Sequence, residues 1–477
     1  MDKPTAKRSI YLLSPKDYGA ETIAVTFAKT SRSPLSFRDI AQELTDADAA
    51  RFHEKWVVGY GHASVAEHAV LHLAFENISR LAMECLQSNR LASYTEKSTR
   101  YQQWDPDCYC QPPELEGHPL IHAYQSTCRE LFALYAELIP PAIEHLDRMD
   151  PAVEGELIPA RARRLRSAAI DSIRYLLPAA ALANVGMTAN ARVLAHALRK
   201  MLSNPLAEVR AIGAEALQVA REETPTLIRY VEPVPFWDEL RAGQAERASH
   251  VAPSGETPVV VRLLDADPEA EDAILTAMLY SYGAGGFADI RAHTSTLPPQ
   301  EKANLLRRWL EERGMHDALP RETEQAVYTF EVVLDQGAYY ELKRHRMMTQ
   351  LPQPLTAALG YETPQLIEQM GAGARYREVM QRAGDTWQEL AVWNGAVASY
   401  VVPNGYRRRL LLKANLRQLG HFCELRSTGK AHYAIREIAF GMAEQIRAVH
   451  PALGAFIRLP AGESADIISR EFFLRQP

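Results

Sequence analysis

Two short segments of the sequence carry side chains that could hold an anionic group. In residues 96–101 (EKSTRY), a serine hydroxyl stands two residues before a guanidinium group, and both can donate hydrogen bonds to phosphate oxygens. In residues 343–346 (KRHR), consecutive cations repel one another unless an anion or an acidic partner lies close. Phosphate, and especially the pyrophosphate of a dinucleotide, suits such a cluster. Each segment taken alone is also compatible with a solvated surface.

The pattern A-N-x-R-x-L-x-H occurs twice and places polar side chains on two predicted helices. It supplies Asn190 and Arg192 in the first half and Asn415 and Arg417 in the second. Arg426 follows Asn415 by three helical turns, so we expect both on one helix face, next to a polar cavity. The alternative is that these residues are ordinary polar groups on a helix surface.

Histidines flank a glutamate in the segment GHASVAEH, which contains His62, Glu67 and His68. The spacing H-x-x-x-x-E-H is longer than the zinc pattern H-x-x-E-H, and no motif supplies a third ligand, so we expect no metal site. The sequence also has no G-x-G-x-x-G after a strand, no P-loop and no G-x-S-x-G elbow. These absences argue against a Rossmann enzyme and a serine hydrolase.

The elements that must position these groups are themselves repeated. Residues 174–196 (RYLLPAAALANVGMTANARVLAH) match residues 399–421 (SYVVPNGYRRRLLLKANLRQLGH), with Pro178 and Pro403 at equal distances before the shared pattern. The segments that begin at Glu67 and Glu322 both alternate like a strand and then change to helical spacing. Matching offsets of this kind indicate an internal duplication.

The length of 477 residues suits two cores, and the fold class that the sequence predicts is α+β. The polar, breaker-rich residues 241–257 predict a linker between domain 1–240, which keeps the serine–arginine segment, and domain 258–477, which keeps the K-R-H-R segment. PVVVRLLDA predicts an opening strand of the second copy, echoed by SIYLLS in the first. Few strands, in mixed or antiparallel sheets, accompany long helices predicted near 119–147, 156–173, 205–223, 269–283, 299–314 and 430–448.

Composition limits the class of function. Hydrophobic residues make up 47% and charged residues 23% of the chain, as in globular proteins. A net charge of −6 argues against a broad basic face for nucleic acid. We find no apolar run long enough to span a membrane and no secretory leader, so we expect a cytoplasmic protein without a membrane partner.

Taken together, these segments resemble the flavin-dependent thymidylate synthases. That family has the motifs H-x-S-x-x-E-H, R-H-R-x-x-S-x-x-x-x-S-x-R-Y, R-x-x-L-P and N-x-R-x-L-x-x-F-x-x-L-R. The first half has Ser88-Asn89-Arg90 where R-H-R belongs, and Met201 or Lys200 at the final arginine. It keeps the first motif at residues 62–68 and also keeps Ser93, Glu96, Ser98, Arg100, Tyr101, Arg174, Asn190 and Arg192.

The second half departs from the family in complementary places. Where the first half keeps Ser98, Arg100 and Arg174, the second half has Pro354, Thr356 and Ser399. Counted back from R-H-R, its Thr323 and Glu324 correspond to Glu67 and His68 of the first half. It keeps Arg344, His345, Arg346, Asn415, Arg417, Phe422 and Arg426.

The resemblance implies reductive methylation of dUMP to dTMP, with FAD as cofactor and with NADPH and methylenetetrahydrofolate as co-substrates. Family members are homotetramers with sites between subunits, so the resemblance also implies composite sites and a homodimer of this chain. The implied catalytic residues are Arg426 and Ser98. The implied dUMP-binding residues are Glu96, Ser98, Arg100, Arg174, Arg344 and Arg426. The implied FAD-binding residues are Ser64, Glu67, His68, Glu96, Asn190, Arg192, Arg344, His345, Arg346, Asn415, Arg417 and His421.

Three other interpretations stay open at this stage. The chain could methylate a different uracil nucleotide, or bind nucleotide or flavin without catalysis, or be an unrelated arginine-rich structural protein. His421 and Lys430 stand where the family often has other residues, which bears on flavin affinity and substrate choice.

Overall fold

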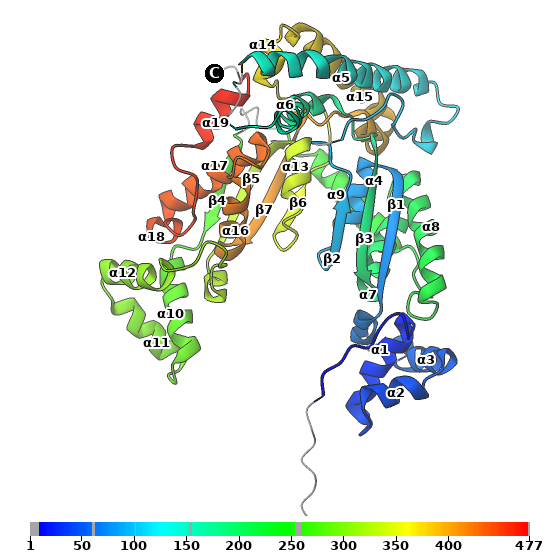
Figure 1. The fold of residues 1–477 in the computed structure, drawn as a ribbon, viewed down its shortest axis with the longest axis vertical. Helices are drawn as coiled ribbons and strands as arrows, with labels where there is room; N and C mark the ends of the chain where they lie inside the picture. Colours follow the sequence, from blue (N-terminus) through cyan, green and yellow to red (C-terminus); the bar gives the residue numbers. More distant parts are fainter. Residues whose placement is uncertain are drawn as a thin grey trace, which may run out of the picture. The chain divides into compact units, whose positions relative to one another are not determined.

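The structure is a computed structural model that describes residues 9–59, 63–100, 102–149, 151, 155–252 and 259–475. Its elements form two compact units that do not follow the order of the chain (Figure 1). The first unit comprises the described residues of Met1–Ile78, Ala82–Lys97 and Ala183–Ala252, and the second those of Ser79–Leu81, Ser98–Leu182 and Pro253–Pro477. Much of the first repeat therefore shares a unit with the second. His62 and Tyr101 lie outside the described residues.

The first unit is built on a three-stranded sheet with the strand order β1-β3-β2. Strands β2 and β3 are antiparallel, with Ala92 opposite Ala189. The strands are β1 (Val70–Ser79), β2 (Ala92–Glu96) and β3 (Leu182–Asn190). The helices are α1 (Ala20–Lys29), α2 (Phe37–Glu43), α3 (Asp46–His53), α4 (Arg80–Gln87), α7 (Ala191–Leu202), α8 (Ala207–Glu223) and α9 (Pro235–Ser249), with η1 (Thr30–Arg32), η2 (Glu54–Gly59) and η3 (Ala63–His68).

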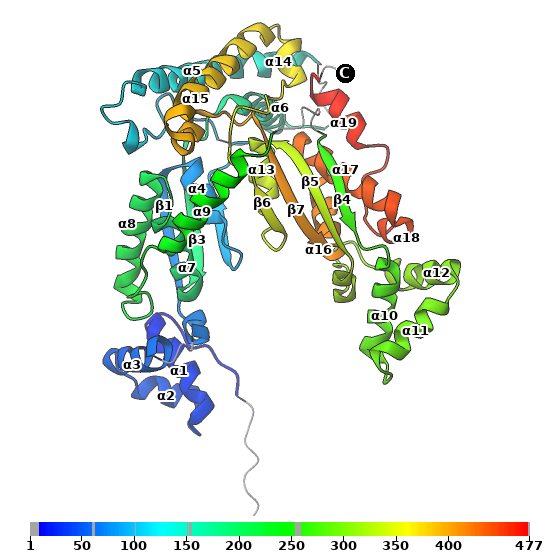
Figure 2. The same cartoon turned by 180° about the vertical axis from the view of Figure 1, so that it is seen from behind.

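The second unit has a four-stranded sheet with the order β4-β5-β7-β6, in which every neighbouring pair is antiparallel. Helices α16 and α17 contact the sheet on one face, and the view from behind in Figure 2 shows the other face. The strands are β4 (Val261–Ala266), β5 (Val327–Asp335), β6 (Thr349–Pro352) and β7 (Arg407–Asn415). The helices around this sheet are α10 (Ala270–Tyr282), α11 (Phe287–Thr296), α12 (Pro299–Leu310), α13 (Gln336–Leu342), α16 (Leu416–Arg426), α17 (Tyr433–Val449), α18 (Pro451–Gly454) and α19 (Ala465–Phe472), with η6 (Arg321–Gln325).

Long helices from both repeats pack together in the second unit. Helix α5 lies against α15, and the hydroxyl oxygens of Thr127 and Thr386 are 2.8 Å apart. The elements are α5 (Ile121–Met149), α6 (Ile158–Ile173), α14 (Gln365–Gln369) and α15 (Gly373–Ala398), with η4 (Pro113–Leu115), η5 (Arg174–Leu176) and η7 (Ser399–Val401). None of the helices in the described part of the chain has the length and apolar character needed to cross a membrane.

The sheet topology confirms the duplication. The order β1-β3-β2 of the first sheet recurs as β5-β7-β6 in the second. Strands β3 and β7 each lead directly into a helix that an asparagine caps: Asn190 Oδ1 accepts from the backbone N–H of Val193 at 2.9 Å, and Asn415 Oδ1 from that of Gln418 at 3.0 Å. The repeated asparagine therefore begins a helix in both halves. Asn415 precedes the first turn of α16 and Arg426 is the last residue of that helix, so the two side chains lie at opposite ends of it.

The elements expected from periodicity are largely confirmed. All six long helical segments are helices, and the strands with their changes to helix are found as β1–α4 and β5–α13. The opening strand of the second copy is β4, but the strand expected at SIYLLS is wrong. Residues 9–14 form no strand, and Ile10 and Leu12 are 89% and 92% exposed. An extended segment needs a hydrogen-bonded neighbour, and the described first sheet has no counterpart of β4.

The predicted linker 241–257 begins inside a helix. Helix α9 continues to Ser249, and none of its residues is buried. Its alanine, glutamate and arginine residues favour a helix even without packing against other elements. Residues 253–258 lie outside the described part. The domain boundaries at 240 and 258 stay a prediction.

The two repeats meet backbone to backbone in the second unit. Pro178 and Pro403, which match in the repeat, form an antiparallel bridge. The backbone N–H of Ala179 donates to the carbonyl of Val402, and that of Asn404 to the carbonyl of Leu177, both at 2.9 Å. Since this pairing starts three residues after Arg174, it holds that arginine beside the second repeat.

Replacing Asn415 with alanine should lower the free energy of unfolding by about 0.5–2 kcal/mol, because the backbone N–H of Gln418 loses its acceptor. Asn415→Ser and Asn415→Asp retain a capping oxygen and should retain most of the stability. Thermal denaturation of the three variants checks this. An alanine variant as stable as the parent would exclude the capping role.

Candidate active site

Arg100 forms the first part of a charged cluster in the second unit. Its Nε and Nη2 donate to the two carboxylate oxygens of Asp171, each at 2.8 Å, and its Nη1 donates to the carbonyl of Lys430 at 2.9 Å. The hydroxyl of Ser98 accepts from the backbone N–H of Arg100 at 3.2 Å. A bidentate pair fixes the plane of the guanidinium group. The serine–arginine segment of the first repeat thus reaches the main chain of the second repeat.

Arg174 forms the second part and is only 3% exposed. Its Nη1 donates to the hydroxyl of Thr99 at 3.3 Å, and its Nη2 lies 3.7 Å from Oε1 of Glu341. The other oxygen of Glu341 is 3.2 Å from Nη1 of Arg426, whose Nε donates to Nε2 of His345 at 3.0 Å. A continuous polar chain therefore runs from Arg174 of the first repeat to His345 of the second.

The ion pairs of this cluster are unequally shared. Arg100 is paired with Asp171, the carboxylate of Glu341 lies near both Arg174 and Arg426, and the buried Asp335 is a further carboxylate that interacts with Arg174. Within the described residues, Nε of Arg174 has no hydrogen-bond partner although it is buried. A buried guanidinium donor without a protein acceptor favours an anionic ligand that carries its own acceptors.

Two histidines of the cluster are held neutral. Burial, and after it the charge of Arg426, lowers the pKa of His345 to about 3. Because Nε2 of His345 accepts from Arg426, its Nδ1 carries the proton. Burial, then Arg174 and Arg100, lowers the pKa of His432 well below its usual range. Its Nδ1 accepts from the backbone N–H of Ala434, so its Nε2 donates to the carbonyl of Asp171 at 3.0 Å.

Of the remaining predicted residues of the second unit, Arg344, Arg346 and His421 lie near this cluster. Asn415 caps the opposite end of α16 from Arg426, and Arg417 pairs with Glu324. Burial lowers the pKa of Arg426. The attraction of Glu341 opposes this shift, and the charges of Arg344 and Arg100 add to it. Arg344 and His421 are exposed, and the ring of His421 lies 5.8 Å from that of His345. Arg346 is half-buried.

Three members of this cluster are not among the residues predicted from the sequence: Asp171, Glu341 and His432. One signal was available for Glu341, since a run of cations at 343–346 requires an acidic partner and Glu341 precedes it by two residues. Nothing in the local sequence marks Asp171, which meets Arg100 from 71 residues away.

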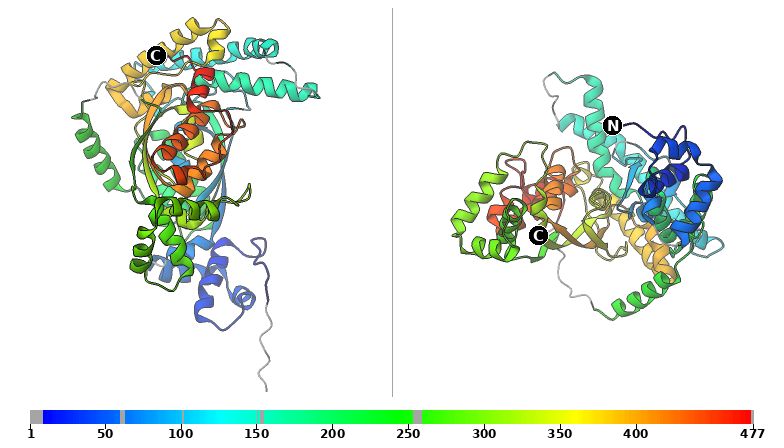
Figure 3. Two further views of the ribbon diagram at one scale, coloured as in Figure 1. Left: turned by 90° about the vertical axis from the view of Figure 1, so that its left-hand side faces the viewer. Right: turned by 90° about the horizontal axis from the view of Figure 1, so that it is seen from below.

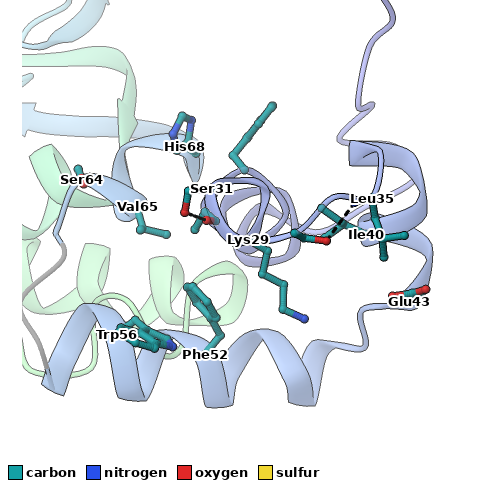
Figure 4. A pocket seen from close by; sticks show the side chains of 13 residues that line it. Lys29, Ser31, Leu35, Ile40, Glu43, Phe52, Trp56, Ser64, Val65 and His68 are labelled. Carbon is teal, nitrogen blue, oxygen red and sulfur yellow. Dashed lines mark hydrogen bonds between the residues drawn. The ribbon is translucent and has the colours of Figure 1, made fainter. Parts of the chain in front are cut away.

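The predicted residues of the first unit form a separate group. Glu67 and Arg192 pair at 2.5 Å, and Glu96 accepts from the side chain of Gln87 at 2.8 Å. Ser64 and His68 line a cavity of about 500 Å³ (Figure 4). The other residues that line it include Phe27, Lys29, Ser31, Phe52 and Trp56. The ring of His68 lies 4.9 Å from that of Phe27. Aromatic walls with a few hydroxyl groups and one lysine suit a flat organic ring.

The same ion pair recurs in the second repeat and corrects the sequence register. Arg417 pairs with Glu324 at 2.8 Å, as Arg192 does with Glu67, so Glu324 corresponds to Glu67 and not to His68. The shift arises in β1, where Asn77 has a φ of 53° and the alternation of buried and exposed residues slips by one. An extra residue in a strand displaces everything before it.

Lys200 and Met201, the two candidates for the place of the final family arginine in the first repeat, have different surroundings. Nζ of Lys200 donates to the hydroxyl of Ser88 at 2.6 Å and to Oδ1 of Asn89 at 3.0 Å. Met201 is fully buried in the core. Lys200 therefore contacts the counterparts of Arg344 and His345, as Arg426 contacts His345, and local acceptors take up its hydrogen bonds.

The neutral His345 predicts a sensitivity to acid. As pH falls below 6.5, the unfolded chain protonates this imidazole, but the folded chain does not until about pH 3, so stability falls with pH across that window. His345→Gln should make the loss of stability between about pH 6.5 and pH 4 less steep, and urea denaturation at several pH values measures it. An unchanged slope in the variant would contradict the buried, neutral state.

Comparison with known proteins identifies the family of the chain. The profile of the family described as "Thymidylate synthase complementing protein" matches residues 13–226 and again residues 262–452. A UPF0159 protein of Chlamydia muridarum is 30% identical over 479 residues, which cover 92% of this chain and 90% of the relative. A flavin-dependent thymidylate synthase of Clostridium tetani is 27% identical over 216 residues, which cover 45% of this chain and 82% of the relative.

Among solved structures, the flavin-dependent thymidylate synthase of Helicobacter pylori complexed with FAD and dUMP is 19% identical to this chain. The match covers 42% of this chain and 100% of that one, with a TM-score of 0.32. The family profile, in contrast, covers most of both halves. The chain therefore belongs to the thymidylate synthase complementing protein family, that of the flavin-dependent thymidylate synthases, and carries two tandem copies of its fold.

Proposed function

We propose that this protein is a flavin-dependent thymidylate synthase that methylates dUMP to dTMP at a site composed from both repeats. The observation that carries the proposal is the convergence of Arg100 and Arg174 from the first repeat with Glu341 and Arg426 from the second. Each repeat retains the groups that the other has lost, and together they form one cationic cluster.

The cluster suits a nucleotide monophosphate. Ser98, Arg100 and Arg174 would bind the phosphate through hydroxyl and guanidinium donors. Asp171 holds the guanidinium plane of Arg100 in a fixed orientation. Arg426 would face the uracil edge, where a cation stabilises negative charge that develops on the ring. Glu341 and the neutral His345 would fix its orientation.

The residues around this cluster also fit FAD. Arg344 and Arg346 offer cations to a pyrophosphate, and His345 offers its Nδ1–H because Arg426 occupies Nε2. Arg417 and His421 lie on the adjoining helix α16, whereas the side chain of Asn415 is engaged as a cap. In the first unit, Ser64, Glu67, His68, Glu96, Asn190 and Arg192 are the proposed flavin contacts. When bound, the flavin supplies the hydride chemistry, and the protein binds and orients.

The co-substrates and the assembly are part of the proposal. NADPH would reduce the flavin, and methylenetetrahydrofolate would supply the carbon. A homodimer would correspond to the family tetramer, and sedimentation of the purified chain would show twice the monomer mass.

The decisive experiment is dTMP formation from dUMP by the purified protein with FAD, NADPH and methylenetetrahydrofolate. The protein should be yellow and should form dTMP only when all components are present. A protein that binds flavin but methylates UMP, and not dUMP, would establish the alternative of a related uracil-nucleotide methylase. Flavin binding with no product from either nucleotide would establish a non-catalytic homologue.

Two substitutions should separate nucleotide binding from flavin binding. Arg100→Ala should weaken dUMP binding by roughly 10- to 150-fold, the value of one charge-assisted contact, and leave FAD affinity nearly unchanged. Arg344→Ala should weaken FAD binding over the same range. Calorimetry with dUMP and flavin absorbance titration measure the two.

Arg470→Ala is the matched control, because the side chain of Arg470 forms an exposed ion pair with Asp466 on α19 and its backbone contact to Gln365 is kept in the variant. Parental dUMP affinity in the Arg100 variant would remove Arg100 from the phosphate site.

A further inference from the structure

Residues 472–475, called the C-terminal segment below, are attached to the rest of the second unit by ion pairs between Arg475 and two buried glutamates. Arg475 donates from Nε and Nη2 to the two carboxylate oxygens of Glu362, at 3.0 and 2.9 Å, and from Nη2 to Glu437 at 3.1 Å. Glu362 and Glu437 are 3% and 5% exposed, and Arg407 adds a bond to Glu362 at 2.8 Å. Although burial opposes it, the attraction of Arg475 and Arg407 lowers the pKa of Glu362. Arg475 is therefore held by the fold of the second unit.

The backbone and rings of this segment reach toward the candidate site. Leu474 donates its backbone N–H to the carbonyl of Thr363 at 2.9 Å, and Phe473 forms a bridge with Pro364. The ring of Phe472 stacks on that of Tyr433, with centroids 4.7 Å apart and planes 4° from parallel. Helices α19 and α17, which carry these two rings, lie side by side (Figure 3).

Tyr433 connects this stack to the proposed phosphate-binding residues. Its ring lies 4.0 Å from that of His432 and is nearly parallel to that of Tyr175, at 6.3 Å. His432 donates to the carbonyl of Asp171, whose carboxylate holds Arg100 in bidentate geometry. Tyr175 follows Arg174 directly. Tyr433, which the C-terminal segment contacts, therefore packs against His432, which bonds the partner of Arg100, and against Tyr175, the neighbour of Arg174.

No such support is found in the described part of the first repeat. Helix α9, which follows α8 as α19 follows α17, has no buried residues. Among the described residues, this aromatic support is therefore found in the second repeat, the one that Arg100 and Arg174 contact.

We propose that Phe472, with the C-terminal segment, acts as a positioning residue that holds His432 and Asp171, and through them Arg100, in the geometry that binds the substrate phosphate. This inference rests on the proposed function, since it assumes that Arg100 meets the nucleotide. It adds that nucleotide affinity depends on an aromatic stack outside the site.

The test compares Phe472→Leu with Phe472→Tyr and with Arg470→Ala on the same helix. Phe472 is chosen because it is half-buried, whereas loss of Arg475 would leave two buried carboxylates without their main cation. Phe472→Leu should weaken dUMP binding by roughly 2- to 12-fold, the affinity equivalent of one aromatic stack, and leave FAD affinity unchanged. Phe472→Tyr keeps the stack and should restore the parental value, and Arg470→Ala should have no effect.

A second measurement does not depend on the ligand. The imidazole nitrogen resonances of His432, assigned with a His432→Gln variant, should shift in Phe472→Leu and stay in place in Phe472→Tyr and Arg470→Ala. Unchanged His432 resonances in the leucine variant, or equal losses of dUMP and FAD affinity, would overturn the positioning role. A parent protein that binds no dUMP would instead overturn the proposed function, and the His432 resonances would still decide the positioning.

Discussion

The rest of the site depends on one constraint, the antiparallel backbone pairing between the segments around Pro178 and Pro403. Pro178 and Pro403 occupy the same place in the two repeats and meet each other across this pairing. Backbone hydrogen bonds are directional, so a pairing of this kind fixes the position of whatever precedes it along the chain. What precedes it in the first repeat is Arg174, and beyond that Asp171 with its partner Arg100. In the second repeat Ser399 takes the place of the arginine, and its hydroxyl donates a hydrogen bond to the carbonyl of Leu355.

A second constraint is electrostatic. Buried arginines are tolerated where carboxylates pair with them. Asp171 pairs with Arg100, Glu341 lies near both Arg174 and Arg426, and the buried Asp335 also interacts with Arg174. Among the described residues the buried Nε of Arg174 still has no hydrogen-bond partner, which suits the proposed phosphate contact. The neutral histidines belong to the same balance, because a protonated imidazole beside these arginines would add to the repulsion.

The duplication accounts for the incomplete set of family motifs in each half. In the first repeat, Lys200 turns to Ser88 and Asn89, so the remnant of the arginine–histidine side is closed by its own hydrogen bonds. In the second, the pair Arg417–Glu324 keeps the geometry of Arg192–Glu67 although the surrounding motif is gone. Structural pairs and helix caps persist in both copies, because each copy must still fold, whereas the proposed ligand-binding groups are divided between them.

The sequence alone determined the features that depend on neighbours along the chain. Amphipathic periodicity predicts the long helices, the change of period predicts the strand-to-helix units, and the matching offsets around Asn190 and Asn415 predict the duplication. Tertiary structure alone decided which carboxylates face the arginines, since Asp171 and Glu341 lie 71 and 167 positions from the arginines of the first repeat that they meet. It also decided that residues 9–14 form no strand and that Asn77 shifts the register, because a strand's partner and a one-residue irregularity lie in contacts across space and leave no period in the sequence.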